Sequence, residues 1–142
     1  MSGYWELDKG NISSTEFFRS LPQYFPEATT FFAEGSSVSS DVIHCYLSHL
    51  EKGDYLPGMQ TIFPKSGKYR CEFSKELMEE LAILSEHHAE PELLDHLSLY
   101  KNNEPILEWH DAFANILLVS KIVGEERVRN FANNFGFSYE AV

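Results

Sequence analysis

The sequence predicts an α+β fold in a single domain over residues 1–142, with a mostly antiparallel sheet of about four or five strands packed against four or five helices. Two observations support this fold. Apolar residues recur at helical spacing in some segments and alternate with polar residues in others. The strand-like segments form two hairpins plus one separate strand, which differs from the regular strand–helix alternation of a parallel sheet.

The first predicted helix begins after Ser13. Ser13 and Glu16 have the spacing of a capping box, in which each side chain accepts a hydrogen bond from the other residue's backbone amide. Pro22 is expected to end or bend this helix, because proline removes a backbone hydrogen bond and clashes with the preceding turn. The segment before it carries Tyr4 and Trp5, which would be unusual in a free tail, so we expect it to dock on the protein or on a second subunit.

Residues 29–33, Thr-Thr-Phe-Phe-Ala, are β-branched and aromatic and predict a strand. A serine-rich loop follows, and Ser39 or Ser40 can cap the next helix. Lys52 and Gly53 are expected to end that helix, because a late cation and a glycine suit its last turn. Residues at helical spacing form its apolar side: Val42, Ile43, Tyr46, Leu47 and Leu50.

A β-hairpin is predicted for residues 60–73, with its turn near Gly67. Apolar and charged residues alternate through residues 68–73, so one face of this arm is expected to be buried. The two cysteines, Cys45 and Cys71, form no C-x-x-C motif. We therefore expect both to be buried thiols that pack as small apolar groups.

Two consecutive helices are predicted after the hairpin. Ser74 can cap the first. Pro91 is expected to separate the two helices, because proline suits the first turn of a helix and not its interior. The apolar stripes are Leu77, Met78, Leu81 and Leu84 in the first helix, and Leu93, Leu94, Leu97 and Tyr100 in the second.

Two strands and a final helix are predicted for the remaining residues. Residues 105–110 predict a strand. Residues 116–123 fit either a strand buried on both faces or a helix. We favour the strand, because Gly124 and the two glutamates after it are typical of a new helix start. Gly136 is expected to end this last helix.

The net charge of −11 is unevenly distributed. Residues 72–95 contain eight carboxylates and one lysine, whereas residues 52–70 contain four basic residues and one carboxylate. An acidic surface repels phosphate backbones, so we expect no nucleic-acid partner. The charge is compatible with a basic protein partner and also with simple solubility. Four acids in this stretch are the predicted partner-binding residues: Glu79, Glu80, Glu86 and Glu90.

Residues 84–96, LSEHHAEPELLDH, contain three histidines and four carboxylates. On a continuous helix, His88, Glu92 and either Asp95 or His96 would share one face at the spacing of metal ligands. Pro91 interrupts that helix, and solvated helix ends explain the same residues without a metal. The candidate metal ligands, for a divalent ion such as zinc, are His87, His88, Glu92, Asp95 and His96.

Glu108 and His110 form a second candidate pair. If residues 105–110 are a strand, these two side chains share its polar face, because alternate residues point to the same side. They are candidates for an acid–base pair, and an ion pair on the solvent-exposed face of the sheet is the alternative. The chain contains no P-loop, no nucleophile elbow, no H-E-x-x-H motif and no EF-hand loop.

Three hypotheses for the function follow. The leading hypothesis is a small acidic cytoplasmic module without catalytic activity or cofactor, which binds a basic protein through the helical face of residues 72–95; a small inhibitor or immunity-type protein is one form of it. The alternative is a small metal- or His/carboxylate-dependent enzyme. The third is a homo-oligomeric structural subunit, in which the basic hairpin meets the acidic helices of another copy. Apolar runs such as residues 116–119 are too short to span a bilayer, and no signal peptide is evident, so we expect no membrane partner.

Overall fold

Seven strands and four α-helices make up residues 3–8, 10–51 and 67–142, the part of the chain that this computed structural model describes. The strands are β1 (Tyr4–Asp8), β2 (Thr30–Glu34), β3 (Lys68–Glu72), β4 (His96–Lys101), β5 (Glu104–Trp109), β6 (Leu117–Ser120) and β7 (Ser138–Ala141). The helices are α1 (Ser14–Tyr24), α2 (Ser40–Ser48), α3 (Lys75–Ser85) and α4 (Glu125–Phe135), with 3-10 turns η1 (Glu90–Glu92) and η2 (Lys121–Val123).

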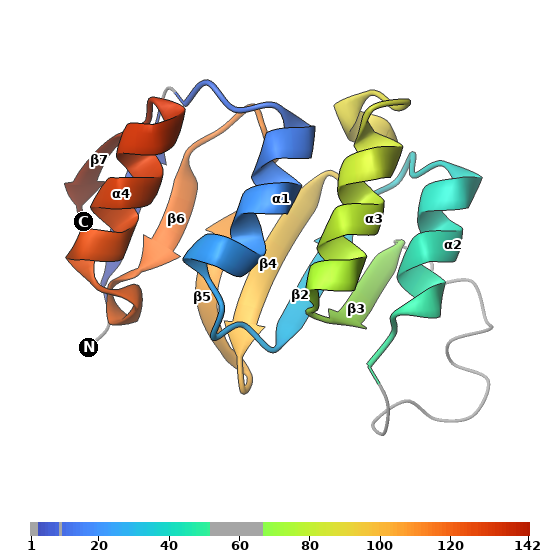
Figure 1. Ribbon diagram of the computed structural model, residues 1–142, viewed down its shortest axis with the longest axis horizontal. Coiled ribbons are helices and arrows are strands. Elements are labelled where there is room, and N and C mark those ends of the chain that lie inside the picture. The colour runs from blue at the N-terminus through green and yellow to red at the C-terminus, as the bar shows by residue number, and fades with distance from the viewer. Residues whose placement is uncertain (1–2, 9, 52–66) are drawn as a thin grey trace.

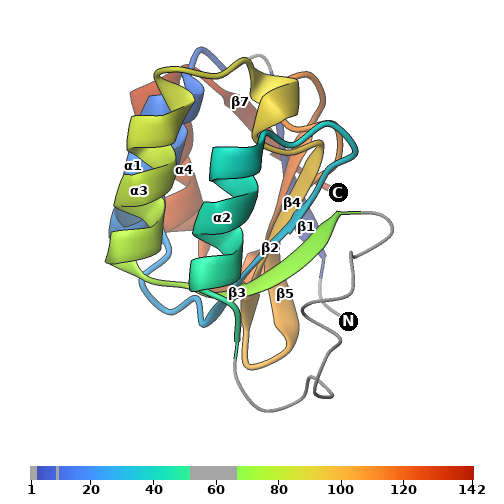
Figure 2. The same cartoon turned by 90° about the vertical axis from the view of Figure 1, so that its right-hand side faces the viewer.

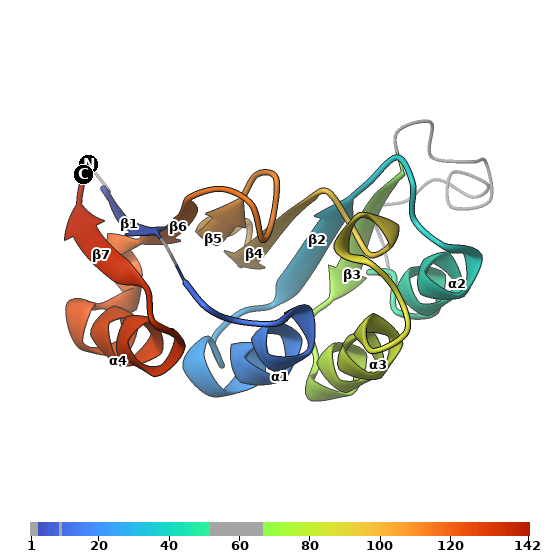
Figure 3. The same ribbon diagram turned by 90° about the horizontal axis from the view of Figure 1, so that it is seen from above.

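All seven strands belong to one antiparallel sheet, in the order β3-β2-β4-β5-β6-β1-β7. The four helices lie side by side on one face of this sheet, and no described helix covers the other face (Figures 1 and 3). The buried apolar side chains lie between the two layers. The described residues therefore form a two-layer α+β structure, as predicted, in which one sheet face is open.

The structure corrects the predicted strand count, because it has seven strands where four or five were expected. Three of the strands were not predicted: β4, which was expected to be a helix, and β1 and β7, which pair with each other in the register Leu7↔Tyr139. β1 is short and mostly half-exposed, and β7 is short and mostly exposed, so neither pattern carries much periodicity. The predicted docking of Tyr4 and Trp5 takes the form of strand β1 between β6 and β7.

The helix predicted after Pro91 is wrong. Pro91 lies in the 3-10 turn η1, and residues 96–101 form strand β4, whose buried Leu97 and Leu99 alternate with half-exposed residues. Leu93, Leu97 and Tyr100 fit helical spacing equally well, so the local pattern is ambiguous. Hydrogen bonding to β2 on one side and β5 on the other decides in favour of the strand.

Other local predictions are confirmed. The Ser13/Glu16 capping box is present, and the Ser74 side chain accepts a hydrogen bond from the Leu77 amide at 3.0 Å. Of the strand predicted for residues 116–123, residues 117–120 form β6, while residues 121–123 form the 3-10 turn η2. α4 ends at Gly136, whose φ of 72° is readily adopted by glycine. Pro22 does not end α1: it lies in the last turn, and the helix continues to Tyr24.

The hairpin prediction is tested only in its second arm. This arm is β3, which pairs with β2, while residues 60–66 lie outside the described residues. Lys52 and Gly53 also lie outside them, and α2 ends earlier, at Ser48. Residues 49–51 then run along the free edge of β3: the Glu51 amide donates to the Arg70 carbonyl, and the Glu72 amide donates to the His49 carbonyl (Figure 2). This segment covers an edge strand that would otherwise expose its backbone groups.

A cluster of aromatic rings joins α1 to α4. Phe131 of α4 is fully buried, and its ring centroid lies 5.3 Å from that of Tyr24 on α1 and 5.6 Å from that of Phe25. Phe137 stacks on it at 5.8 Å.

Both cysteines are buried free thiols, as expected. Within the described residues, no helix has the length and apolar character needed to cross a bilayer.

We expect Phe131→Ala to lower the free energy of unfolding by about 3–5 kcal/mol, because it leaves a cavity where α1 and α4 meet. Urea denaturation followed by circular dichroism measures this change. Ile122→Ala is the control, since Ile122 is 48% exposed and its truncation should change the stability by no more than about 0.5 kcal/mol. Equal losses in both variants would contradict the assignment of Phe131 to the core.

Candidate functional site

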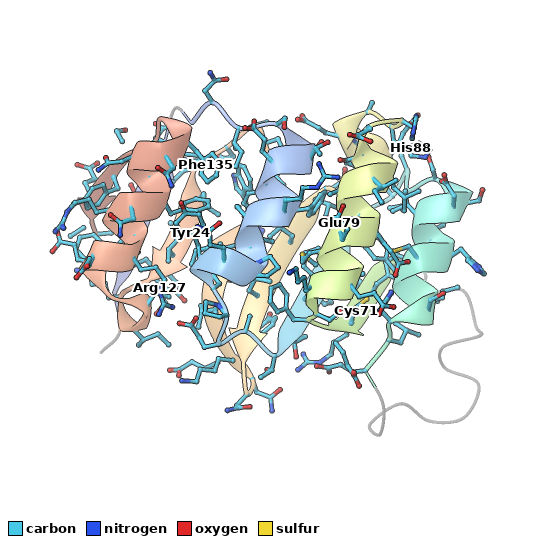
Figure 4. The ribbon with its side chains drawn as sticks, in the orientation of Figure 1. Tyr24, Cys71, Glu79, His88, Arg127 and Phe135 are labelled. Atoms are coloured by element: carbon cyan, nitrogen blue, oxygen red, sulfur yellow. The ribbon has the colours of Figure 1, made fainter. Side chains whose placement is uncertain are left out.

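The predicted histidine cluster becomes a corner where three segments meet. α3 ends at Ser85, a turn carries His87 and His88, and η1 follows. His88 faces the start of α2 across this corner (Figure 4). Its Nε2 lies 2.8 Å from an oxygen of Asp41, and its Nδ1 lies 2.9 Å from an oxygen of Glu92.

Both ring nitrogens of His88 are therefore engaged by carboxylates. A metal ion bound at either nitrogen would displace one of these two contacts, so this geometry favours an imidazolium held between two anions. Hydrogen bonding to Asp41 and Glu92 raises the pKa of His88 above its ordinary value of 6.5. The same contact lowers the pKa of Asp41. His88 thus ties α2 to the segment that follows α3.

The other predicted metal ligands lie in different places. Asp95 accepts hydrogen bonds from the amide and hydroxyl of Ser36. His96 begins β4, where its Nδ1 accepts a hydrogen bond from the Asp111 amide at 2.9 Å. His87 is exposed. Because β4 is a strand, its residues leave the helix layer, and in the described structure the five candidates form no common ligand set.

The second candidate pair, Glu108 and His110, is also separated into different contacts. Glu108 lies on the open face of the sheet, in register with Ser98 and Leu118, and accepts a hydrogen bond from Tyr4. Burial and this contact with a carboxylate raise the pKa of Tyr4. The ring of His110 lies 5.4 Å from that of His96. The described contacts give Glu108 and His110 no hydrogen bond to each other.

Two of the four predicted partner-binding acids lie on α3, which stands between α1 and α2 (Figure 1). Glu79 pairs with Arg19 of α1 at 2.9 Å, and both side chains stay about half exposed. Glu80 is directed toward α2 and pairs with His49, just after that helix, at 2.8 Å. Glu86 follows α3 and is exposed. The fourth, Glu90, lies in η1, where partial burial raises its pKa.

Glu80 also belongs to a cluster that sequence reasoning missed. One Glu80 oxygen lies 2.8 Å from His49 Nε2, and the other lies 3.8 Å from Cys45 Sγ. One ligand atom from each of these three residues lies within 4.8 Å of the other two, the grouping needed to hold a metal ion. The Cys45-x-x-x-His49 spacing is visible in the sequence, but Glu80 comes 31 positions after His49 and enters only through packing of α3 on α2.

Surface hollows flank α1 on the helix side. One of about 460 Å³ is lined by residues of α1 and α4, including Tyr24 and Arg127. Another of about 440 Å³ lies between α1 and α3 and is lined by Arg19, Met78 and Glu79, among others. Neither is lined by a histidine or a cysteine, so the two clusters described above lie outside them.

Comparison of the chain with models of protein families finds no match, and no curated protein or solved structure matches it significantly.

We expect His88→Gln to reduce stability more at pH 5.5 than at pH 8.5. The folded-state pKa of His88 is raised, so its stabilising contribution is fully present below the unfolded value of 6.5 and is lost as the pH rises through the folded value. Urea denaturation at the two pH values measures the difference, which should stay within about 1 kcal/mol, the scale of exposed ion pairs.

His87→Gln is the matched control, since His87 is the exposed neighbour of His88. It should give the same small change at both pH values. An equal loss of stability at both pH values in His88→Gln would show that the ring contributes through packing and not through its charge. An NMR titration of the histidine ring protons measures the pKa of His88 directly.

Proposed function

We propose that this protein binds a basic protein partner through the outer side of α3. The observation that carries the proposal is the arrangement of acids around an exposed apolar residue. Ile83 is 48% exposed, although most large apolar side chains of the described residues are buried. Glu76, Glu79 and Glu80 precede it, and Glu86 follows it, all at helical spacing on the same side. We name these five residues the α3 face.

The charges elsewhere strengthen the acidity of this surface. All four arginines of the chain form ion pairs with carboxylates of the same chain. Their partners are Glu79 for Arg19, Glu51 for Arg70, Glu27 for Arg127 and Glu125 for Arg129. Over the whole chain, 22 carboxylates stand against 11 lysines and arginines. A negative field of this kind speeds encounter with a positively charged partner and disfavours an acidic one.

An apolar centre within a charged rim is the usual organisation of a protein–protein interface. Ile83 supplies such a centre, and Leu47, 42% exposed on the neighbouring helix α2, adds to the apolar surface of this side. Glu79 and Glu80 are already paired within the chain, so Glu76 and Glu86 are the acids most available to a partner. The partner is therefore expected to present lysine or arginine beside an apolar residue.

Self-association is the alternative, in which basic and acidic surfaces of two copies attract each other. Lys68 and Arg70 lie on β3, at the edge of the sheet, and would have to meet the α3 face of another copy. Arg70 is already paired with Glu51 at 2.6 Å, which leaves less positive charge for such a contact. We therefore favour a different protein as the partner. A monomer by light scattering at low salt would agree with this choice, and a salt-sensitive dimer would favour self-association.

Selection from a displayed library of random peptides tests the proposal. Wild-type protein should enrich peptides that combine basic and apolar residues. A synthetic peptide made from the enriched sequences should bind Glu76→Lys/Glu86→Lys at least about tenfold more weakly, since two attractive charges become repulsive. Its affinity for the wild type should fall as salt rises.

Glu126→Lys/Glu140→Lys is the matched control. It changes the net charge equally, and Glu126, like Glu76, lies in the first turn of its helix. This variant should keep most of the affinity. Enrichment of acidic or uncharged peptides would contradict the proposal, as would equal weakening by the two double variants.

A further inference from the structure

Cys45, His49 and Glu80 bring three different metal-binding groups to one point between α2 and α3. Cys45 and His49 are four residues apart, so the helical turn at the end of α2 places both on one side. Glu80 reaches them from the middle of α3. Thiolate, imidazole and carboxylate are the three side-chain groups that bind zinc in proteins.

We propose that these three residues form a binding site for a zinc ion, with water as the fourth ligand. In a tetrahedral zinc site with such ligands, neighbouring ligand atoms lie about 3.3–3.6 Å apart. Sγ of Cys45 and an oxygen of Glu80 are 3.8 Å apart, and Nε2 of His49 is 2.8 Å from the other oxygen. Small side-chain rotations therefore suffice to admit the ion.

The charge balance also suits zinc. A doubly charged cation with one thiolate, one carboxylate and one neutral imidazole has no net charge, which limits the cost of its partial burial. Cys45 is 5% exposed, and the side chain of His49 is 14% exposed. The Glu80 side chain is 44% exposed and opens the cluster to solvent. Zinc can enter, and water can occupy the fourth position, from that side.

Zinc binding must release the proton of the Cys45 thiol. Burial and the neighbouring Glu80 raise the pKa of Cys45 to about 12, so the thiol is protonated at neutral pH without the metal. Binding then forms one Zn–S bond and transfers one proton to solvent. Below the pKa of Cys45, the apparent affinity for zinc is therefore expected to rise about tenfold per pH unit. The metal would replace the present hydrogen bonds of Glu80 and connect α2 to α3 directly.

Cobalt(II) and zinc(II) titrations of the purified, reduced protein test the site. Wild type should bind one equivalent of cobalt with a sulfur-to-cobalt charge-transfer band, and zinc should abolish that band. Cys45→Ser should lose the band. His49→Gln and Glu80→Gln, at less buried positions, should keep the fold by circular dichroism and weaken zinc binding by more than about tenfold.

Two variants serve as controls. Cys71→Ala removes the other buried thiol, and His44→Gln removes an exposed histidine of the same helix. Both should keep the band and the affinity. Zinc should raise the melting temperature of wild type and of His44→Gln, but not of His49→Gln. The absence of a thiolate band in the wild type would overturn the proposal, as would binding that is lost in Cys71→Ala but kept in Cys45→Ser.

Discussion

The pairing of β4 with β2 and β5 is the constraint on which the rest of the structure depends. It joins residues 96–101 to residues 30–34, far back in the chain, and so builds the middle of the sheet. It also ends the helical path after Pro91 and sends His96 away from His88. α3 ends before this point, at Ser85, and lies between α1 and α2 on the sheet (Figure 3).

The position of α3 between two helices explains the electrostatics of the candidate sites. Consecutive residues on a helix point in directions about 100° apart. Glu79 therefore reaches Arg19 of α1, while Glu80 reaches His49 and Cys45 on the other side. α3 thus contributes to an ion pair on the side of α1 and to a cluster of metal-binding groups on the side of α2, while Glu76 and Glu86 are exposed to solvent. The proposed partner surface and the proposed zinc site share Glu80.

Features set by local geometry could be predicted from the sequence. The capping box of Ser13 and Glu16, the cap at Ser74 and the glycine stop at Gly136 depend on backbone groups a few residues away. The alternation of buried and more exposed residues in β3 could also be predicted, because successive residues of a strand point to opposite faces of the sheet. β1 and β7 were missed, since such short strands have little periodicity: β1 forms by pairing with both β6 and β7, and β7 forms by pairing with β1 at the edge of the sheet.

The sequence by itself determined the α+β class, the acidic surface and most helix starts, because these depend on composition and on contacts within one or two turns. Only the tertiary structure decided which titratable groups meet. The histidines of residues 87–96 are close in sequence but separate, since Pro91 and the pairing of β4 redirect the chain. Cys45 and Glu80 are 35 positions apart and lie together, because α2 and α3 pack on the same face of the sheet.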